Sequence, residues 1–165
     1  MEALIAELEF TPSLPWSVLF LRLIGAVVLT AIIGFEREAS GKHAGLRTHM
    51  LVSLASALYC LITLDLISRD YPGTVRVDPI RMVEAVTAGV AFLAAGLIVF
   101  SKGEVRGLTT GASLWLAAAT GLCAGLGLWP MAVVATIVAM IIMRLLKVVE
   151  KEVIETKSSP HDGAR

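Results

Sequence analysis

Five long apolar stretches divide this 165-residue chain, and they lie at residues 16–35, 48–67, 82–100, 110–128 and 131–147. Each is close to the roughly 20 residues that an α-helix needs to cross the hydrocarbon of a bilayer. The chain is 56% hydrophobic and 17% charged, so a water-soluble fold of this size has too few polar residues to cover the apolar surface. The pattern therefore predicts an all-α, polytopic transmembrane helical bundle of about five spans, and it excludes a sizeable soluble domain.

Basic residues are shared unequally between the connections of this bundle. Ten Lys and Arg residues fall in the connections 36–47 and 101–109 and after residue 143, whereas three fall in the connection 68–81. Because basic residues gather on the cytoplasmic side of a membrane, we expect the N-terminus outside and the C-terminus in the cytoplasm. The connection 128–130 carries no charge, and a re-entrant hairpin there would move the tail to the other side.

The same reasoning divides the chain into three parts. We expect an extracytoplasmic segment at 1–15, a transmembrane domain at 16–147 and a short cytoplasmic tail at 148–165. The first span is read as retained, not as a cleaved signal peptide, because no Lys or Arg precedes Arg22 and the charged pair Glu36 and Arg37 follows the span.

Composition excludes several classes of function. Fourteen basic and fourteen acidic residues balance, so the chain has no electrostatic footprint for nucleic acid. Cys60 and Cys123 each lie inside an apolar stretch, where cysteine behaves as a small hydrophobe, and no disulfide framework is expected. The sequence has no HExxH, GxSxG or Walker motif. We therefore expect a non-enzymatic protein without a cofactor, and metal binding stays undetermined.

Small residues recur at a spacing of four in three of the spans. In lipid, helices associate through close packing of such residues, because the solvent is as apolar as the side chains. Packing within one chain explains these faces, and a homo-oligomer is the alternative. The faces are Ala26, Thr30 and Gly34; Ala85 and Gly89; Ala91 and Ala95; and Ala117, Gly121 and Gly125.

Three ionisable residues fall within the apolar stretches, on the side predicted to face outward. They are Arg22, Asp65 and Glu84. A charge in the hydrocarbon is costly unless it is paired or hydrated, so each is a candidate functional residue. One interpretation is a structural ion pair in which Arg22 satisfies the carboxylates. The other is a shallow outer pocket that binds a cation such as Mg²⁺ through the two acids.

The predicted cytoplasmic side carries a second set of candidates, in the connections 36–47 and 101–109. We expect Glu36, Arg37, Arg47, Arg106 and Thr109 to form a functional face, because two loops that the topology places together supply them. A solvated charge cluster is the simpler explanation. His43 and His49 lack a third ligand and are interpreted as polar packing residues.

These cytoplasmic segments also carry a family resemblance. Residues 33–38 read IGFERE, 44–52 read AGLRTHMLV, 105–115 read VRGLTTGASLW and 121–128 read GLCAGLGL. In order and spacing they resemble the membrane domain of the MgtC/SapB family of bacterial inner-membrane proteins, over about residues 18–147. One departure lies at 88–96, where AGVAFLAAG has alanine in place of two glycines of the family's GxGFLGAG segment.

The resemblance implies a role in adaptation to low magnesium and, in pathogens, in survival within host cells. It also implies action by contact with other membrane proteins, among them the F-type ATP synthase. Some family members carry a cytoplasmic small-molecule-binding domain after the last span, and we expect regulation through that domain to be absent here. Two functional hypotheses follow: a membrane regulator that works through protein contacts, or a small carrier or channel subunit for Mg²⁺ or another cation.

Overall fold

The computed structural model of the chain describes residues 1, 12–69, 78–101 and 104–158. Within these residues the chain forms five helices: α2 (Trp16–Ala39), α3 (Leu46–Ser68), α4 (Pro79–Leu97), α5 (Leu108–Leu126) and α6 (Trp129–Ser158). A short antiparallel hairpin of β1 (Val99–Ser101) and β2 (Glu104–Arg106) joins α4 to α5 and pairs Phe100 with Val105. The predicted all-α transmembrane bundle is confirmed, and the hairpin is an addition that the sequence analysis did not foresee.

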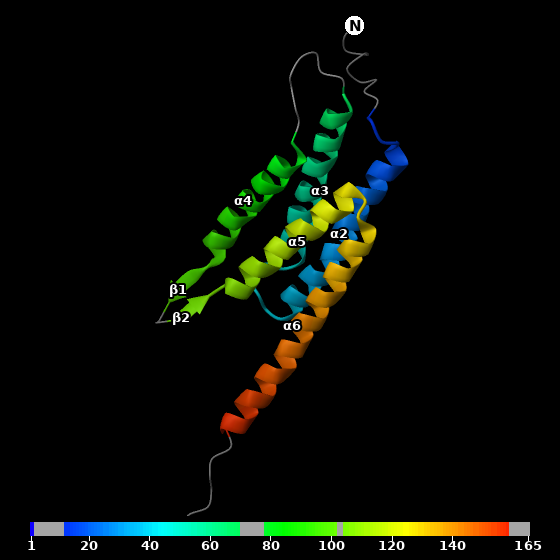
Figure 1. The fold of residues 1–165 in the computed structure, drawn as a ribbon. Helices are drawn as coiled ribbons and strands as arrows, with labels where there is room; N and C mark the ends of the chain where they lie inside the picture. The colour runs from blue at the N-terminus through cyan, green and yellow to red at the C-terminus, as the bar shows by residue number, and fades with distance from the viewer. Residues whose placement is uncertain (2–11, 70–77, 102–103, 159–165) are drawn as a thin grey trace, which may run out of the picture.

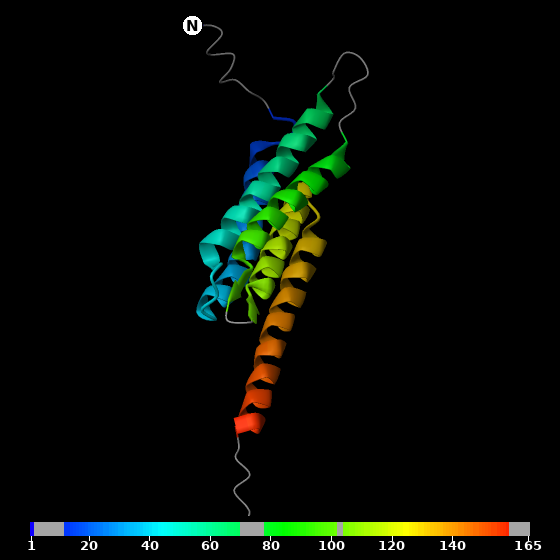
Figure 2. The ribbon, with the colours of Figure 1, turned by 90° about the vertical axis from the view of Figure 1, so that its left-hand side faces the viewer.

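Successive helices run in alternating directions (Figures 1 and 2). Helices α2, α3, α4 and α5 are long and apolar enough to cross a membrane, and α6 begins with a shorter apolar part, Trp129–Leu145. Helix α6 continues without interruption to Ser158. The described residues therefore show no re-entrant turn within α6, and this helix runs antiparallel to α5.

The turn from α5 to α6 is tight because Gly127 adopts a backbone conformation with φ of +78°. The N–H groups of Gly127 and Leu128 donate to the carbonyls of Ala124 and Cys123, at 3.0 and 2.8 Å. This left-handed glycine cap satisfies carbonyls that the helix end leaves open, and it reverses the chain at once.

Helix α5 is the centre of the bundle, since it packs against α2, α3, α4 and α6. Small residues allow the close approach. A Cβ atom added at Gly121 would overlap the backbone of Ser53 on α3, and one added at Gly125 would lie 2.9 Å from the carbonyl oxygen of Ala57. Gly34 on α2 is equally confined, because its Cβ would lie 2.8 Å from the Cα atom of Leu46. These small faces therefore pack within the chain, as expected in lipid.

Helix α4 behaves differently. A Cβ atom added at Gly89 or Gly96 would meet no atom within 4 Å, and Ala91 and Ala95 are exposed. Phe92 is 81% exposed on the same helix. The small residues of α4 thus lie mostly on the surface of the bundle, in contrast to those of α5.

The alternation of helices gives the bundle two ends. We call the end where α2 stops and α3 and α5 start the Arg37 end. We call the opposite end, where α2 and α4 start and α5 turns into α6, the Arg22 end. The hairpin lies at the Arg37 end (Figure 1). The candidates predicted for the cytoplasmic side therefore lie at the Arg37 end, and those predicted for the outward side lie at the Arg22 end.

Candidate functional site at the Arg37 end

Arg37 lies in the last turn of α2 and is 7% exposed. Its Nη2 atom donates to the hydroxyl oxygens of Thr109, at 3.2 Å, and Thr110, at 3.5 Å. Both threonines belong to the first turn of α5. The end of α2 and the start of α5 are therefore joined by one side chain, across 72 residues of sequence.

The acidic neighbours of Arg37 have other partners. Glu36 Oε1 accepts a hydrogen bond from the hydroxyl of Ser40 at 2.9 Å, and Glu38 Oε2 accepts one from the backbone N–H of Leu46 at 2.8 Å. Glu38 thus supplies an acceptor to the open N–H groups at the start of α3. Among the described residues no carboxylate lies within 4.0 Å of the Arg37 guanidinium. Glu38 was not a candidate from the sequence, because it lies inside α2, eight residues before Leu46.

A buried polar network adjoins Arg37. His49 is fully buried, with Nδ1 at 2.8 Å from the carbonyl oxygen of Gly45 and Nε2 at 3.1 Å from the hydroxyl of Ser113. Because a carbonyl oxygen only accepts, Nδ1 must carry a proton. The Ser113 Oγ atom also lies 2.8 Å from the carbonyl oxygen of Thr110, and its single proton is donated either to that carbonyl or to Nε2. His49 is therefore a hydrogen-bonded packing residue that links α3 to α5, and Ser113 is a partner that the sequence analysis missed.

The other candidates lie on the surface of the same end. Arg47 occupies the second position of α3, Arg106 ends β2, and both are exposed, as is Thr109. The structure thus brings all five candidates to one end of the bundle, and hydrogen bonds join Arg37 to Thr109 within the set.

The candidates at the Arg22 end do not form the expected cluster. Arg22 Nη1 donates to the carbonyl oxygen of Gly125 at 2.8 Å, while Asp65 pairs with Arg69 at 2.6 Å. Glu84 is exposed on α4. Among the described residues no ion pair joins Arg22 to either acid. The reason is local: the last turn of α5 offers Arg22 an open carbonyl, and Arg69 stands one helical turn after Asp65, where such pairs meet.

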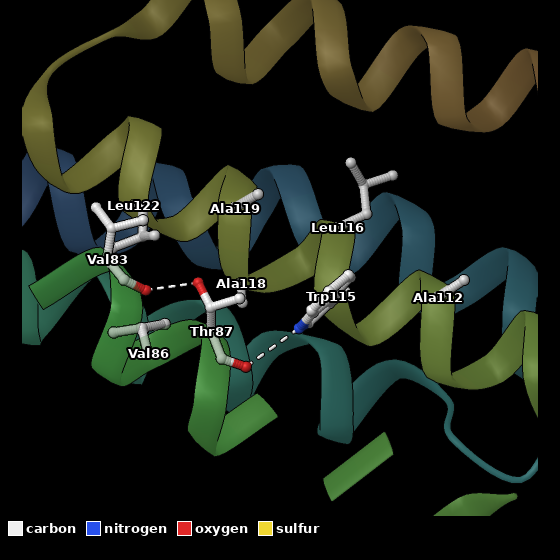
Figure 3. A pocket seen from close by; sticks show the side chains of 9 residues that line it. All are labelled: Val83, Val86, Thr87, Ala112, Trp115, Leu116, Ala118, Ala119 and Leu122. Atoms are coloured by element: carbon white, nitrogen blue, oxygen red, sulfur yellow. Dashed lines mark hydrogen bonds between the residues drawn. The ribbon is translucent and has the colours of Figure 1, made fainter. Parts of the chain in front are cut away.

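Two apolar grooves flank α4. The one between α4 and α5 has a volume of about 430 Å³, and Trp115 crosses it to donate from Nε1 to the carbonyl of Thr87 at 3.2 Å (Figure 3). The other, between α3 and α4, has a volume of about 660 Å³. No Asp, Glu, Lys, Arg or His among the described residues lines either groove. Their chemistry suits acyl chains of membrane lipid.

The described residues also contain no group of three or more His, Cys, Asp or Glu side chains arranged to hold a metal ion.

Comparison with known proteins gives a consistent result. The family model described as MgtC family matches residues 23–152. The chain is 35% identical over 129 residues to "Putative magnesium transporter YhiD" of Escherichia coli strain K12, a match covering 76% of this chain and 59% of that protein. It is 36% identical over 135 residues to "Protein SrpB" of Synechococcus elongatus, covering 77% and 74%.

A third relative is "Protein MgtC" of Brucella abortus strain 2308, which is 38% identical over 125 residues, covering 76% of this chain and 50% of that protein. The matches to YhiD and MgtC thus span 59% and 50% of those relatives. No solved structure matches the chain.

Proposed function

Because the chain belongs to the MgtC family and is a multi-pass bacterial inner-membrane protein, we propose that it is a non-enzymatic regulator of adaptation to low magnesium. It acts through contacts with another membrane protein, and the F-type ATP synthase is the first candidate partner. The names of relatives support the link to magnesium, since one is called MgtC and another is named for magnesium transport.

One observation carries this proposal: Arg37 ties the start of α5 to the end of α2. The α2–α3 connection and the segment before α5 therefore form one surface instead of two independent loops. Arg47 and Arg106 are exposed beside it. Exposed arginines on a fixed backbone suit recognition of a partner's carboxylates, because the planar guanidinium binds them with two parallel hydrogen bonds.

The positive-inside distribution supports placing this surface in the cytoplasm. On the same ground, residues 1–15 lie outside, the transmembrane domain covers 16–147, and the tail from 148 lies inside.

Growth at low magnesium tests the proposal. Arg47→Ala and Arg106→Ala should abolish growth support while membrane abundance and melting temperature stay near those of the original protein. Arg81→Ala is the matched control, because Arg81 is an exposed arginine at the Arg22 end. Normal growth of both variants would refute the proposed face. Absence of both variants from the membrane would show that these residues are needed for folding and not for recognition.

The name of the E. coli relative favours a second candidate, transport of Mg²⁺. A pathway needs polar groups along its depth, yet the buried hydroxyls of Thr30, Ser56 and Thr120 donate to carbonyls of their own helices. Flux of Mg²⁺ into liposomes that contain the purified protein separates the two functions. The regulator shows no flux above empty liposomes, whereas a transporter does.

A further inference from the structure

The Arg37 guanidinium has more hydrogen-bond donors than the described residues accept. Its Nη2 atom reaches two threonine hydroxyls, and the bond to Thr110 is long at 3.5 Å. Its Nε atom is buried and has no hydrogen-bond partner among the described residues. A buried donor without an acceptor is destabilising, so this site lacks an acceptor that would complete it.

The surroundings of Arg37 add positive charge. The guanidinium reaches from α2 to the first turn of α5, where the partial positive charge of a helix N-terminus lies. The residue before that turn is Gly107, which has no side chain to accept from the N–H groups, and no described side chain accepts from them either. The nearest acids, Glu36 and Glu38, bond to Ser40 and Leu46. The Glu36 charge stabilises the Arg37 cation electrostatically, but no described carboxylate lies within ion-pair distance of the guanidinium.

We propose that a phosphate-type oxyanion binds at this junction, held by Arg37, by the open N–H groups of the first turn of α5 and by the Thr109 and Thr110 hydroxyls. Tetrahedral oxyanions suit this donor set, because they accept a guanidinium fork and backbone N–H groups at the same time. Thr109 is exposed and gives the anion its approach from the surface. The anion takes over the guanidinium donor that makes the long bond to Thr110.

Two sources supply this chemistry: the phosphodiester of an anionic lipid headgroup, or free inorganic phosphate. Arg37 lies two residues from the end of α2, and Thr109 is the second residue of α5, so the site is at the boundary of the spanning helices where headgroups lie. This inference deepens the proposed function, since it gives the same face a ligand.

The test is ligand-induced thermal stabilisation of the purified full chain, reconstituted in neutral phosphatidylcholine. One arm adds phosphatidylglycerol, a second adds inorganic phosphate, and a third adds acetate at equal ionic strength as the carboxylate that a partner protein would present. We expect phosphatidylglycerol or phosphate to raise the melting temperature by several degrees in a saturable manner. The arm that responds identifies the source.

Variants assign the effect to the site. Arg37→Gln should abolish the shift, whereas Lys42→Gln, which removes an exposed charge from the same end, should retain it. Thr109→Val keeps the shape of the side chain and the Arg37 charge, and it should raise the half-saturating concentration at least threefold. If Arg37→Gln does not fold, the Thr109→Val variant tests whether the anion binds at this site.

Three results would overturn the inference: no shift with either phosphate source, an equal shift with acetate, or an unchanged shift in the folded Arg37→Gln or Thr109→Val protein. Because the assay contains no protein partner, its failure leaves the growth experiment of the proposed function untouched.

Discussion

Replacement of Gly121 by alanine tests the packing that holds the bundle together. In the structure, a Cβ atom at this position would lie 2.9 Å from both the Cα and the carbonyl carbon of Ser53, and closer still to the carbonyl oxygen. Carbon atoms in contact prefer about 3.5 Å or more, so α5 and α3 must separate locally by at least roughly 0.6 Å. Ser53 also donates to the carbonyl of Ala26 at 3.0 Å, so the shift disturbs α2 as well.

The magnitude follows from two opposing terms. Overpacking of this kind costs about 1–3 kcal/mol, while alanine gains about 1 kcal/mol over glycine in a helix interior. We expect a net loss of up to about 2 kcal/mol, which lowers the melting temperature by up to roughly 8 °C in a chain of this length. Gly89→Ala is the matched control. Its new Cβ meets nothing within 4 Å, so only the gain in helix propensity remains.

The assay uses the chain's own thiols. Cys60 is buried and Cys123 is partly buried, so a thiol-reactive fluorescent dye reports unfolding of the detergent-solubilised protein on heating. If Gly121→Ala melts no lower than Gly89→Ala, the two helices do not approach each other as closely as described, and the packing argument fails.

Two further predictions concern topology and the Arg22 end. In a cysteine-free variant, an impermeant thiol reagent added to whole cells should label a cysteine that replaces Gly73 and spare one that replaces Lys42. Labelling of the cysteine at position 42 alone would show that the protein has the opposite orientation in the membrane. Arg22→Ala should destabilise the protein by about 2 kcal/mol, since it removes a charged donor from the Gly125 carbonyl. Adding Glu84→Ala to this variant should recover none of the lost stability, because Arg22 and Glu84 form no ion pair. Recovery of stability in chemical denaturation would instead support an ion pair between them.

The helices could be predicted from the sequence because a helix that crosses lipid needs about 20 consecutive apolar residues, and such stretches are visible in the sequence. Their ends were less predictable. The stretch 82–100 runs past the end of α4 at Leu97, because hydrophobicity alone does not distinguish its last residues, Val99 and Phe100, from a helix. Residues that are β-branched or aromatic also favour strands, and here they pair with β2.

The candidate site could be predicted in its location and not in its contacts. Charge asymmetry and the order of the spans brought Arg37 and Thr109 to one end, as the structure has them. The partner of Arg22 could not be predicted, because a backbone carbonyl at a helix end leaves no mark on the sequence. For the same reason the sequence gives no sign of which glycines meet a neighbouring backbone, as Gly121 does and Gly89 does not.

Site-specific photo-cross-linking in cells tests most directly whether the protein acts through the Arg37 end. A photoreactive residue at Lys42, which is exposed in the α2–α3 connection, is compared with one at Ser68, which is exposed at the Arg22 end. During growth at low magnesium, we expect a discrete adduct with a membrane protein from position 42 that Arg47→Ala removes, and none from position 68. An adduct from position 68 alone, or one from position 42 that Arg47→Ala leaves unchanged, would contradict it.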